Sequence, residues 1–371
     1  MGATSQFRPL DIPTDSDGFV KSFTLSSYNC SEANEARAFF QEYGFIVISN
    51  VFTPEQCNDT ISDIWNVIES LVTQSVRNDE QLWTQTCVLF YFFYLTYNFR
   101  LPYYLRLWSK TGILDEGIVG WESLWTRQIL FNRQTPALHT AFSSVLGTEN
   151  LLVSHDRYGM LRPAKKHPER STTTNLHLDM NPWLYIDEED NSKQLEVLGE
   201  LNYDSDDDWT TENNEPGCSK VGELHVQGLV NLADNLEEDG GFWLVAGFHK
   251  YLPQWAADHR DLRNFYGHYD HFIMIGREYI PELYDAARHI SSRAGSAILW
   301  DQRTMHGSRA NCSARPRYAQ FCKMFPVDHP AMTPERAEKR RKVIIAKLQA
   351  VNIDPATDLT PLGRKLFGLQ V

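Results

Sequence analysis

The sequence predicts a mainly β fold with flanking helices, in which a helical region precedes an antiparallel sandwich or barrel. Apolar residues recur at helical spacing through residues 31–150, whereas short β-rich segments separated by turn residues begin at Leu151. With 371 residues, of which 42% are hydrophobic, the chain is long enough to bury a core without disulfide bonds.

The composition divides the chain into four stretches. Residues 1–30 are predicted to be a loosely ordered lead-in, and residues 31–150 a helical region packed on the β-rich part. Residues 151–330 are the predicted core, and residues 331–371 the C-terminal helix and tail. An insertion at 187–215 holds twelve Asp or Glu and one Lys, which is typical of a solvated surface segment.

Local patterns predict the individual elements. Thr53 followed by Pro54 is typical of a helix N-cap and first turn. The expected helices of the first half are 32–43, 54–71, 81–108 and 136–146, with a short strand at 44–48. The expected later strands are 151–155, 173–180, 223–232, 242–245, 272–275, 297–300 and 318–325, followed by a helix at 333–351.

Several functional classes are excluded. The net charge of −13 argues against a nucleic-acid partner, because phosphate backbones attract basic surfaces. The longest apolar run, 87–97, is too short to span a bilayer, so no membrane association is expected. Six cysteines without a CxxC pair, and a start without an apolar leader, indicate reduced thiols and a cytoplasmic location.

The segment from Asn175 to Met180 carries the most informative pattern. Residues two apart on a strand point to the same face, so His177 and Asp179 are expected to project together. An imidazole beside a carboxylate supplies two of the three ligands of a non-heme Fe(II) facial triad. The third ligand is expected to be a histidine from a distant strand.

His306 is the expected third ligand. It follows an apolar strand and a turn, and it lies 129 residues after His177, which leaves room for the body of a barrel. Two other His-x-Asp pairs are poorer candidates: 259/261 lies in a polar run, and 268/270 lies too close to His306.

An arginine on the next strand completes the pattern. Arg317 follows His306 by eleven residues, so it can bind the far carboxylate of a short diacid while His306 binds the metal. Arg309 and Arg315 compete for this role, and strand placement favours Arg317.

Four ordered segments resemble the phytanoyl-CoA dioxygenase family of Fe(II)/2-oxoglutarate oxygenases. They are residues 39–57, His177-Leu178-Asp179, residues 239–250, and His306-Gly307-Ser308 with Arg317. The resemblance covers roughly residues 36–325 and implies a double-stranded β-helix, that is, a jelly roll. It also implies an enzyme that hydroxylates or otherwise oxidises a small molecule with release of succinate and CO2.

The resemblance assigns roles to these residues. Fe(II) would be held by His177, Asp179 and His306, and the co-substrates would be 2-oxoglutarate and O2. Arg317 and Ser308 would contact 2-oxoglutarate. Because related halogenases carry a small residue at the carboxylate position, Asp179 favours hydroxylation or a similar oxidation.

Four further residues are weaker candidates. Tyr158 and Arg162 could reach the cofactor from the preceding strand and loop. Asn181 and Trp183 continue the strand parity of the metal motif, so they could line the substrate pocket, although Trp183 could equally serve packing. A non-catalytic, cupin-like metal-binding protein and a metal enzyme that uses no 2-oxoglutarate stay open as alternatives, and the oligomeric state is not predicted.

Overall fold

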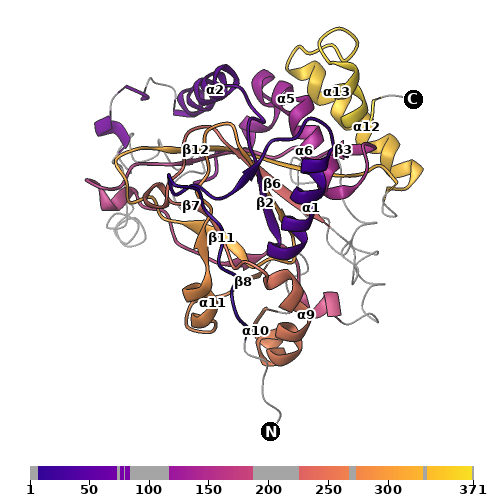
Figure 1. Ribbon diagram of the computed structural model, residues 1–371. Coiled ribbons are helices and arrows are strands. Elements are labelled where there is room, and N and C mark those ends of the chain that lie inside the picture. The colour runs from indigo at the N-terminus through magenta and orange to yellow at the C-terminus, as the bar shows by residue number, and fades with distance from the viewer. Residues whose placement is uncertain are drawn as a thin grey trace.

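The computed structural model (Figure 1) combines two β-sheets with helices on both sides. It describes residues 7–72, 76–78, 80–83, 117–186, 225–266, 273–328 and 332–369. The predicted helix at 81–108 lies outside these residues, apart from the 3-10 turn Glu80–Trp83, and so does the acidic insertion at 187–215.

The larger sheet has seven strands. Its order is β1 (Ser22–Phe23), β2 (Phe45–Ile48), β10 (Ala297–Asp301), β6 (Val226–Asn231), β12 (Arg317–Pro326) and β3 (Leu151–Val153), and β4 (Tyr158–Leu161) also pairs with β12. All its pairings are antiparallel except β1 with β2. The early strand β2 therefore lies beside β10, far along the chain.

The smaller sheet has five strands. Its order is β8 (Ile273–Met274), β5 (His177–Leu178), β11 (His306–Arg309), β7 (Gly241–Leu244) and β9 (Arg288–His289). The two sheets meet through side chains, because Phe242 of β7 packs on Trp300 of β10 with ring centroids 4.3 Å apart.

Helices cover both sheets. Near the larger sheet lie α1 (Ser31–Tyr43), α2 (Pro54–Val72), α5 (Arg127–Arg133), α6 (Pro136–Leu146), α12 (Pro334–Ala350) and α13 (Pro361–Leu366), as Figure 1 shows. The smaller sheet is accompanied by α7 (Pro182–Ile186), α9 (Phe248–Asp258), α10 (Arg263–Tyr266) and α11 (Pro281–Ala286). Short 3-10 turns are Trp121–Trp125, Pro168–Arg170, Glu237–Asp239 and Arg260–Leu262.

Strand alternation on β12 separates a helix-facing side from an inner side. Gly228 lies opposite Cys322, and a Cβ added at Gly228 would approach Phe142 of α6, so this pair faces the helices. Residues 317, 319, 321 and 323 therefore face the smaller sheet.

Most predicted elements agree with the observed ones. Helices α1, α2, α6 and α12 begin and end within two residues of their predicted limits. Thr53 caps α2 as expected: its hydroxyl accepts from the Gln56 amide N–H at 3.1 Å, and the Gln56 side chain accepts in return at 3.0 Å.

Three local predictions need correction. Part of the lead-in is ordered, since β1 pairs with β2 and Phe19, Val20 and Phe23 are buried. The strand expected at 173–180 contracts to His177–Leu178. Strands β4 and β11 were not anticipated, because glycine, serine and arginine obscure their periodicity.

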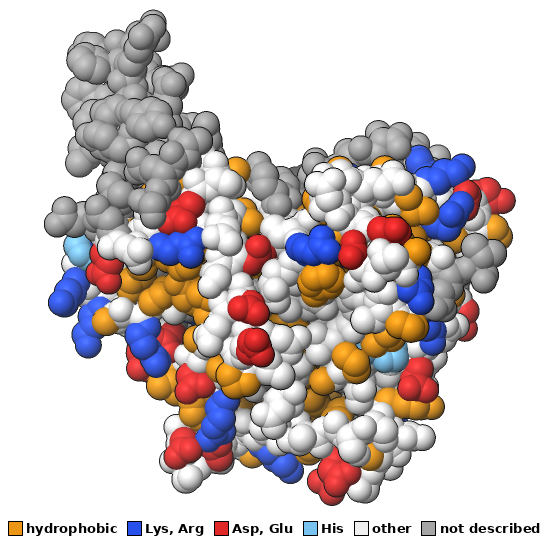
Figure 2. Space-filling model, turned by 90° about the horizontal axis from the view of Figure 1, so that it is seen from above, with side chains coloured by type: hydrophobic (Ala, Val, Ile, Leu, Met, Phe, Trp, Pro, Cys, Tyr) orange, Lys and Arg blue, Asp and Glu red, His pale blue; other side chains and the backbone are white. Residues whose placement is uncertain are grey.

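No described helix has the length and apolar character needed to cross a membrane. On the described part of the face shown in Figure 2, acidic and basic side chains are interspersed rather than separated into patches.

Candidate metal centre

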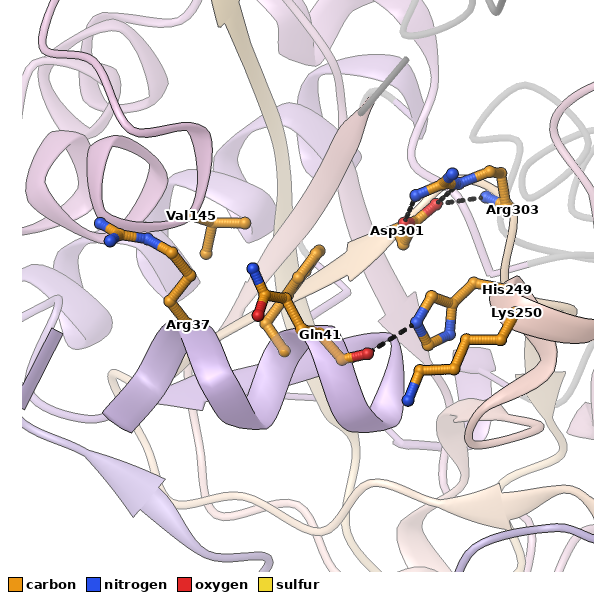
Figure 3. A pocket seen from close by; sticks show the side chains of 8 residues that line it. Arg37, Gln41, Val145, His249, Lys250, Asp301 and Arg303 are labelled. Carbon is orange, nitrogen blue, oxygen red and sulfur yellow. Dashed lines mark hydrogen bonds and ion pairs between the residues drawn. The ribbon is translucent and has the colours of Figure 1, made fainter. Parts of the chain in front are cut away.

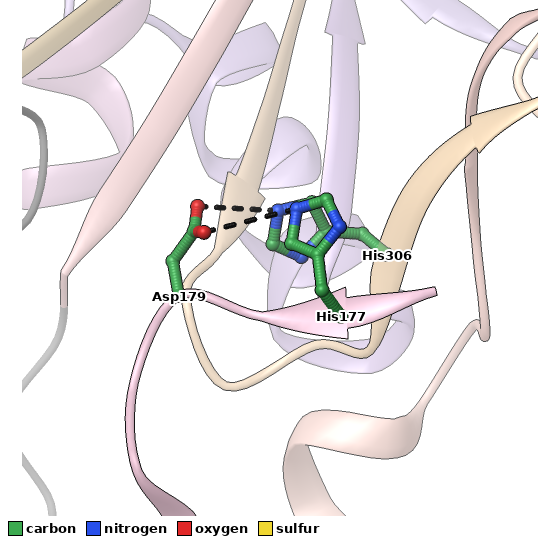
Figure 4. Close-up of side chains that lie close together, drawn as sticks. All are labelled: His177, Asp179 and His306. Atoms are coloured by element: carbon green, nitrogen blue, oxygen red, sulfur yellow. Dashed lines mark ion pairs between the residues drawn. The ribbon is translucent and has the colours of Figure 1, made fainter. Parts of the chain in front are cut away.

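Strands β5 and β11 bring His177, Asp179 and His306 together (Figure 4). The two histidines are direct partners in the antiparallel pairing, and Asp179 follows the end of β5. Asp179 Oδ1 lies 3.7 Å from His177 Nε2, and Oδ2 lies 3.5 Å from His306 Nε2. One candidate ligand atom from each residue lies within 4.8 Å of the others.

Both imidazoles are oriented through Nδ1. His177 Nδ1 donates to Asn175 Oδ1 at 3.0 Å, and His306 Nδ1 donates to the Thr304 carbonyl at 2.8 Å. When Nδ1 carries the proton, Nε2 presents its lone pair, which is the state a metal requires. Each lone pair is directed toward Asp179.

The carboxylate of Asp179 is oriented from the larger sheet. Gln227 Nε2 of β6 donates to Asp179 Oδ2 at 2.6 Å, and Gln227 Oε1 accepts from the Trp300 indole at 2.9 Å. The Gln302 side chain donates to the Asp179 main-chain carbonyl. These contacts fix the third candidate ligand between the two sheets.

The protonation states suit metal binding. Burial is the largest influence on His177 and, with His306 nearby, lowers its pKa to about 4. Burial alone would raise the pKa of Asp179, but His306, His177 and the Gln227 amide together lower it below the usual carboxyl range. At neutral pH the site therefore offers an ionised carboxylate and a neutral His177.

The centre is enclosed on one side and open on the other. The Trp300 and Phe242 rings lie 5.2 and 5.9 Å from the His306 ring, and the His306 side chain is 3% exposed. The side chains of His177 and Asp179 are 19% and 16% exposed. A bound group can therefore approach from the His177 side.

The donor set fits a divalent transition metal. Two imidazoles and one carboxylate on one face are the ligand set of non-heme Fe(II) sites with open positions. Among the described residues, these three are the group of His, Cys, Asp and Glu side chains close enough to hold a metal ion. The 259/261 pair is not assembled into such a group, since His259 bonds the Trp255 carbonyl, and the 268/270 pair lies outside the described residues.

Arg317 begins β12 on the same inner side. It is 5% exposed; Nη2 donates to Asn231 Oδ1 at 3.0 Å, and Nε has no hydrogen-bond partner within the described chain. Burial lowers its pKa to about 10. A buried guanidinium is costly unless an anion compensates its charge, and no described carboxylate forms an ion pair with it.

Glycines make room beside this guanidinium. A Cβ at Gly241 would lie 2.9 Å from Arg317 Nε, and one at Gly159 would lie 3.4 Å from Nη1. The competing arginines are occupied elsewhere: Arg309 pairs with Glu237, and Arg315 pairs with Asp239. These contacts favour Arg317 over both as an anion-binding group.

Ser308 lies on β11 opposite Phe242, two residues after His306, so its side chain shares the face of that ligand. Its carbonyl accepts from the Asn175 main-chain N–H at 3.0 Å, which joins the segment before β5 to β11. The structure thus brings Ser308 to the same side as the metal ligands.

Tyr158 and Arg162 do not join the site. Tyr158 pairs with Gln320, on the helix-facing side of β12, and its hydroxyl donates to Asp63 of α2 at 2.8 Å. Arg162 is buried and donates to the Trp83 and Arg170 carbonyls. The expected contact with the cofactor is therefore not supported, because Tyr158 lies on the opposite face from Arg317 and Arg162, which follows β4, is bound to main-chain carbonyls.

Asn181 and Trp183 serve the fold. Asn181 Oδ1 accepts from the Trp183 main-chain N–H at 3.0 Å, at the start of α7. The Trp183 ring is fully buried, and its indole donates to the Ala256 carbonyl of α9. The chain leaves the strand after Leu178, so the parity argument no longer applies to these residues, and packing accounts for Trp183.

The turn between β10 and β11 connects His306 to the end of α1. Thr304 accepts from His306 through its carbonyl, and its hydroxyl donates to the Gly44 carbonyl at 3.3 Å. Gly44 has a φ of 79°, and a Cβ there would lie 2.6 Å from the Thr304 hydroxyl. The residue that ends α1 is thus in contact with the turn that positions the candidate ligand His306.

A separate pocket of about 330 Å³ lies between α1, α9 and this turn (Figure 3). It is lined by Arg37, Phe40, Gln41, Val145, His249, Lys250, Asp301 and Arg303. None of the three candidate metal ligands lines it. Its charges are largely satisfied locally, since Arg303 pairs with Asp301 and Lys250 pairs with Glu42.

Sequence reasoning missed Asn175, Gln227, Asn231 and Thr304. Three of them carried a usable signal. Gln227 and Asn231 are polar residues four apart on an apolar strand, so they share a face. Asn175 likewise shares the parity of His177. Thr304 acts through its main chain, which side-chain patterns do not reveal.

Comparison with known proteins adds to this geometry. The family model described as phytanoyl-CoA dioxygenase matches residues 199–319. A Dictyostelium discoideum protein whose name assigns it to the phytanoyl-CoA dioxygenases is 31% identical, over 96% of this chain and 97% of that protein. The ectoine dioxygenase of Halomonas elongata is 30% identical over 39% of this chain and 44% of its own length.

The fold has counterparts among solved structures. A Salmonella typhimurium LT2 protein titled as an oxidoreductase superposes with a TM-score of 0.53 at 16% identity, covering 92% of this chain and 83% of that one. The resemblance inferred from the sequence is therefore confirmed by the family model and by a relative that spans nearly the whole chain. The chain belongs to the phytanoyl-CoA dioxygenase family.

Proposed function

We propose that this protein is an Fe(II)/2-oxoglutarate-dependent dioxygenase that hydroxylates or similarly oxidises a small molecule, releasing succinate and CO2. The observation that carries the proposal is the buried Arg317 guanidinium, which has no carboxylate partner in the described chain and shares the inner side with a two-histidine, one-carboxylate centre. A dianion that binds a metal at one end and an arginine at the other fits this pair of features.

His177, Asp179 and His306 would hold the iron on one face, leaving positions for a bidentate co-substrate and for O2. Bound iron would supply the activation of O2 toward a C–H bond. The protein's part is to fix the ligands through Asn175, Thr304 and Gln227, and to exclude water on the Trp300 side.

Arg317 would bind the distal carboxylate of 2-oxoglutarate. Asn231 accepts a hydrogen bond from Arg317, and Gln227 donates one to Asp179. Both lie on the same face of β6, four residues and thus ~13 Å apart along the strand. Gly241 and Gly159 leave the guanidinium accessible from the inner side, and Ser308 faces the same space from β11.

The fold proposed with this function is a double-stranded β-helix core at 151–330, completed by β1 and β2 and packed against the helices of residues 31–150. The two facing sheets and the match to an oxidoreductase structure support it.

The test is succinate release from 2-oxoglutarate with Fe(II) and O2 across a panel of metabolites, using the His177→Ala protein as the blank. Iron-dependent succinate formation is the expected result. Absence of turnover with every compound would favour the non-catalytic metal-binding alternative, and turnover that survives Arg317→Ala would favour an enzyme that uses no 2-oxoglutarate.

A further inference from the structure

Three buried side chains on the helix-facing side of the larger sheet hold nitrogen atoms without hydrogen-bond partners. They are Trp125, which ends a 3-10 turn, Arg133, which ends α5, and His155, two residues after β3. Trp125 is 8% exposed, and the other two are fully buried. The atoms that lack a partner in the described chain are Trp125 Nε1, Arg133 Nε and both ring nitrogens of His155. Buried polar atoms are nearly always hydrogen-bonded, so such a group of atoms requires an explanation.

The three side chains form one cluster. The Trp125 indole stacks on the His155 ring, with centroids 4.3 Å apart and an interplanar angle of 21°. Arg133 Nη1 donates to the Leu124 carbonyl at 3.2 Å, and Nη2 donates to the Asp156 carbonyl. The guanidinium is thus bonded to the chain neighbours of both stacked residues, which holds it beside them.

The neighbours of Arg133 do not supply an anion to it. The acidic groups that act on it are Cys322, Tyr158 and Asp156. Burial raises the pKa of Cys322 to about 12 and is the main cause that raises the pKa of Tyr158 well above its usual value, so both stay neutral at pH 7. The Asp156 carboxylate accepts instead from the main-chain N–H and the guanidinium of Arg157.

The chemistry of the unpartnered atoms indicates a ligand that only accepts. The Trp125 indole and Arg133 Nε are obligate donors, and a neutral imidazole also carries one N–H, whichever ring nitrogen holds it. Burial, with Arg133 and Arg340 nearby, keeps the pKa of His155 well below its usual value, so His155 is neutral at pH 7. A water molecule would bring two more hydrogens to these three donors. A halide brings none, and its charge offsets that of the buried guanidinium.

The packing around the cluster limits the size of the ligand. The Phe367 ring, at the end of α13, lies 5.3 Å from the His155 ring, and the Phe367 carbonyl accepts from Arg340 at 2.7 Å. Since Arg133 and His155 are fully buried, an organic acid would have to bury its carbon chain here as well. A monatomic or small inorganic anion has no such chain.

We propose that Trp125, Arg133 and His155 bind a small monovalent anion, of which chloride is the physiological example. The anion accepts from the indole, the guanidinium and the imidazole, and it joins the turn before α5, the end of α5 and the segment after β3. The site lies on the opposite side of the larger sheet from the candidate metal centre. It is independent of the proposed function, and its effect is on stability.

The experiment measures stability against chloride at constant ionic strength. Full-length protein loaded with Zn²⁺ and 2-oxoglutarate is unfolded by urea in mixtures of sodium gluconate and sodium chloride, with gluconate as the bulky reference anion. The equilibrium constant for folding is expected to rise saturably with chloride, by about tenfold once chloride is about ninefold above its dissociation constant. Bromide should act in the same way. No rise up to about 200 mM chloride would overturn the proposal.

Variants locate the response. Trp125→Phe keeps an aromatic ring but removes the N–H, so it should weaken chloride affinity about tenfold. Arg133→Met removes the charge and should abolish the response. Trp255→Phe is the matched control: Trp255 of α9 is also buried, stacks on His259 with centroids 4.8 Å apart, and has an indole N–H without a partner in the described chain. It should respond as the native protein does.

Arg317→Met separates this site from the other buried guanidinium and should retain the chloride response. Native chloride affinity in Trp125→Phe, an equal loss in Trp255→Phe, or a loss only in Arg317→Met would each contradict the assignment. If Arg133→Met does not fold, Trp125→Phe alone decides. Succinate release is measured separately, so failure of the proposed function leaves this test unaffected.

Discussion

The side-chain amide of Gln227 donates to Asp179 Oδ2 at 2.6 Å, across the gap between the two sheets. This contact joins the larger sheet to a candidate metal ligand that directly follows β5 of the smaller sheet. Gln227 is itself fixed, because its carbonyl accepts from Trp300. The carboxylate is thus held in place before any metal binds.

Gln227→Leu should weaken metal binding by about tenfold, because removal of a group that orients a ligand typically costs 10–100-fold in affinity. Titration with Co²⁺, followed by its visible absorption, measures the effect. Gln254→Leu on the exposed face of α9 is the matched control and should bind as the native protein does. Equal affinities in the two variants would contradict a role for Gln227.

Replacing both His177 and Asp179 with alanine should lower Co²⁺ affinity by more than about 100-fold, since two of three ligands are removed. The chain offers a control with identical spacing, His259→Ala with Asp261→Ala. That variant should retain affinity, because His259 bonds the Trp255 carbonyl away from the triad. Comparable losses in both double variants would contradict the assignment.

Arg317→Met should raise the KM for 2-oxoglutarate by about 100-fold, since loss of a buried, charge-assisted partner costs several kcal/mol. Arg309→Met removes an arginine that already pairs with Glu237, so its KM should stay near the native value. Steady-state succinate assays on both variants decide the point, and an unchanged KM in Arg317→Met would exclude the proposed contact.

In the absence of 2-oxoglutarate, the same Arg317→Met change should raise the stability of the protein. A buried guanidinium that lacks a carboxylate partner in the described chain carries a desolvation cost, which an apolar side chain of similar length avoids. We expect the free energy of unfolding in urea to rise by about 1 kcal/mol or more. Added 2-oxoglutarate should reverse the order, stabilising native protein and not the variant.

Acid should destabilise the metal-free protein through two buried histidines. Burial lowers the pKa of His289, as of His177, to about 4 in the folded state, while the unfolded value is near 6.5. Since the folded pKa is depressed, their stabilisation is fully present above pH 6.5 and is lost progressively as pH falls toward 4. Each histidine should cost about 2 kcal/mol between pH 8 and 5.

Urea unfolding of native protein and of His289→Asn at pH 8 and pH 5 measures this dependence. The variant should lose less stability on acidification, because it lacks one of the two buried histidines. His289 contacts the Gly240 carbonyl and the Ser291 hydroxyl, so its replacement leaves the candidate metal centre intact. An identical pH response in both proteins would show that His289 is protonated without penalty.

The parts of the fold that sequence predicts well are those with strong periodicity or capping. Helix α6 has its predicted limits, and the capping pair of Thr53 and Gln56 starts α2. Strand β11 was missed because His306-Gly307-Ser308-Arg309 has no alternation of apolar and polar residues. It is extended in the structure because it pairs with β7 on one side and β5 on the other.

The candidate ligands His177 and Asp179 could be paired from the sequence because they are two residues apart in a segment expected to be extended, although the observed strand β5 ends before Asp179. Which groups orient them could not be predicted: Gln227 stands out as a polar residue on an apolar strand, but its contact with Asp179 depends on how the two sheets face each other, and Thr304 acts through its carbonyl. The prediction for Tyr158 was wrong because the side of the sheet on which it lies depends on the register of β4 with β12, which no local sequence pattern specifies.

The position of β2 in the larger sheet has a consequence for how the chain can be divided. Ile46 and Val47 pair with Leu299 and Ile298 of β10, and Gly44 contacts the turn that leads to His306. A fragment starting at Leu151 would leave the edge of β10 without its partner β2, and the turn before His306 without its hydrogen bond to Gly44. The larger sheet is therefore built from both sides of the compositional boundary near residue 150, and the pairing of β2 with β10 cannot form until residues 297–300 have been synthesised.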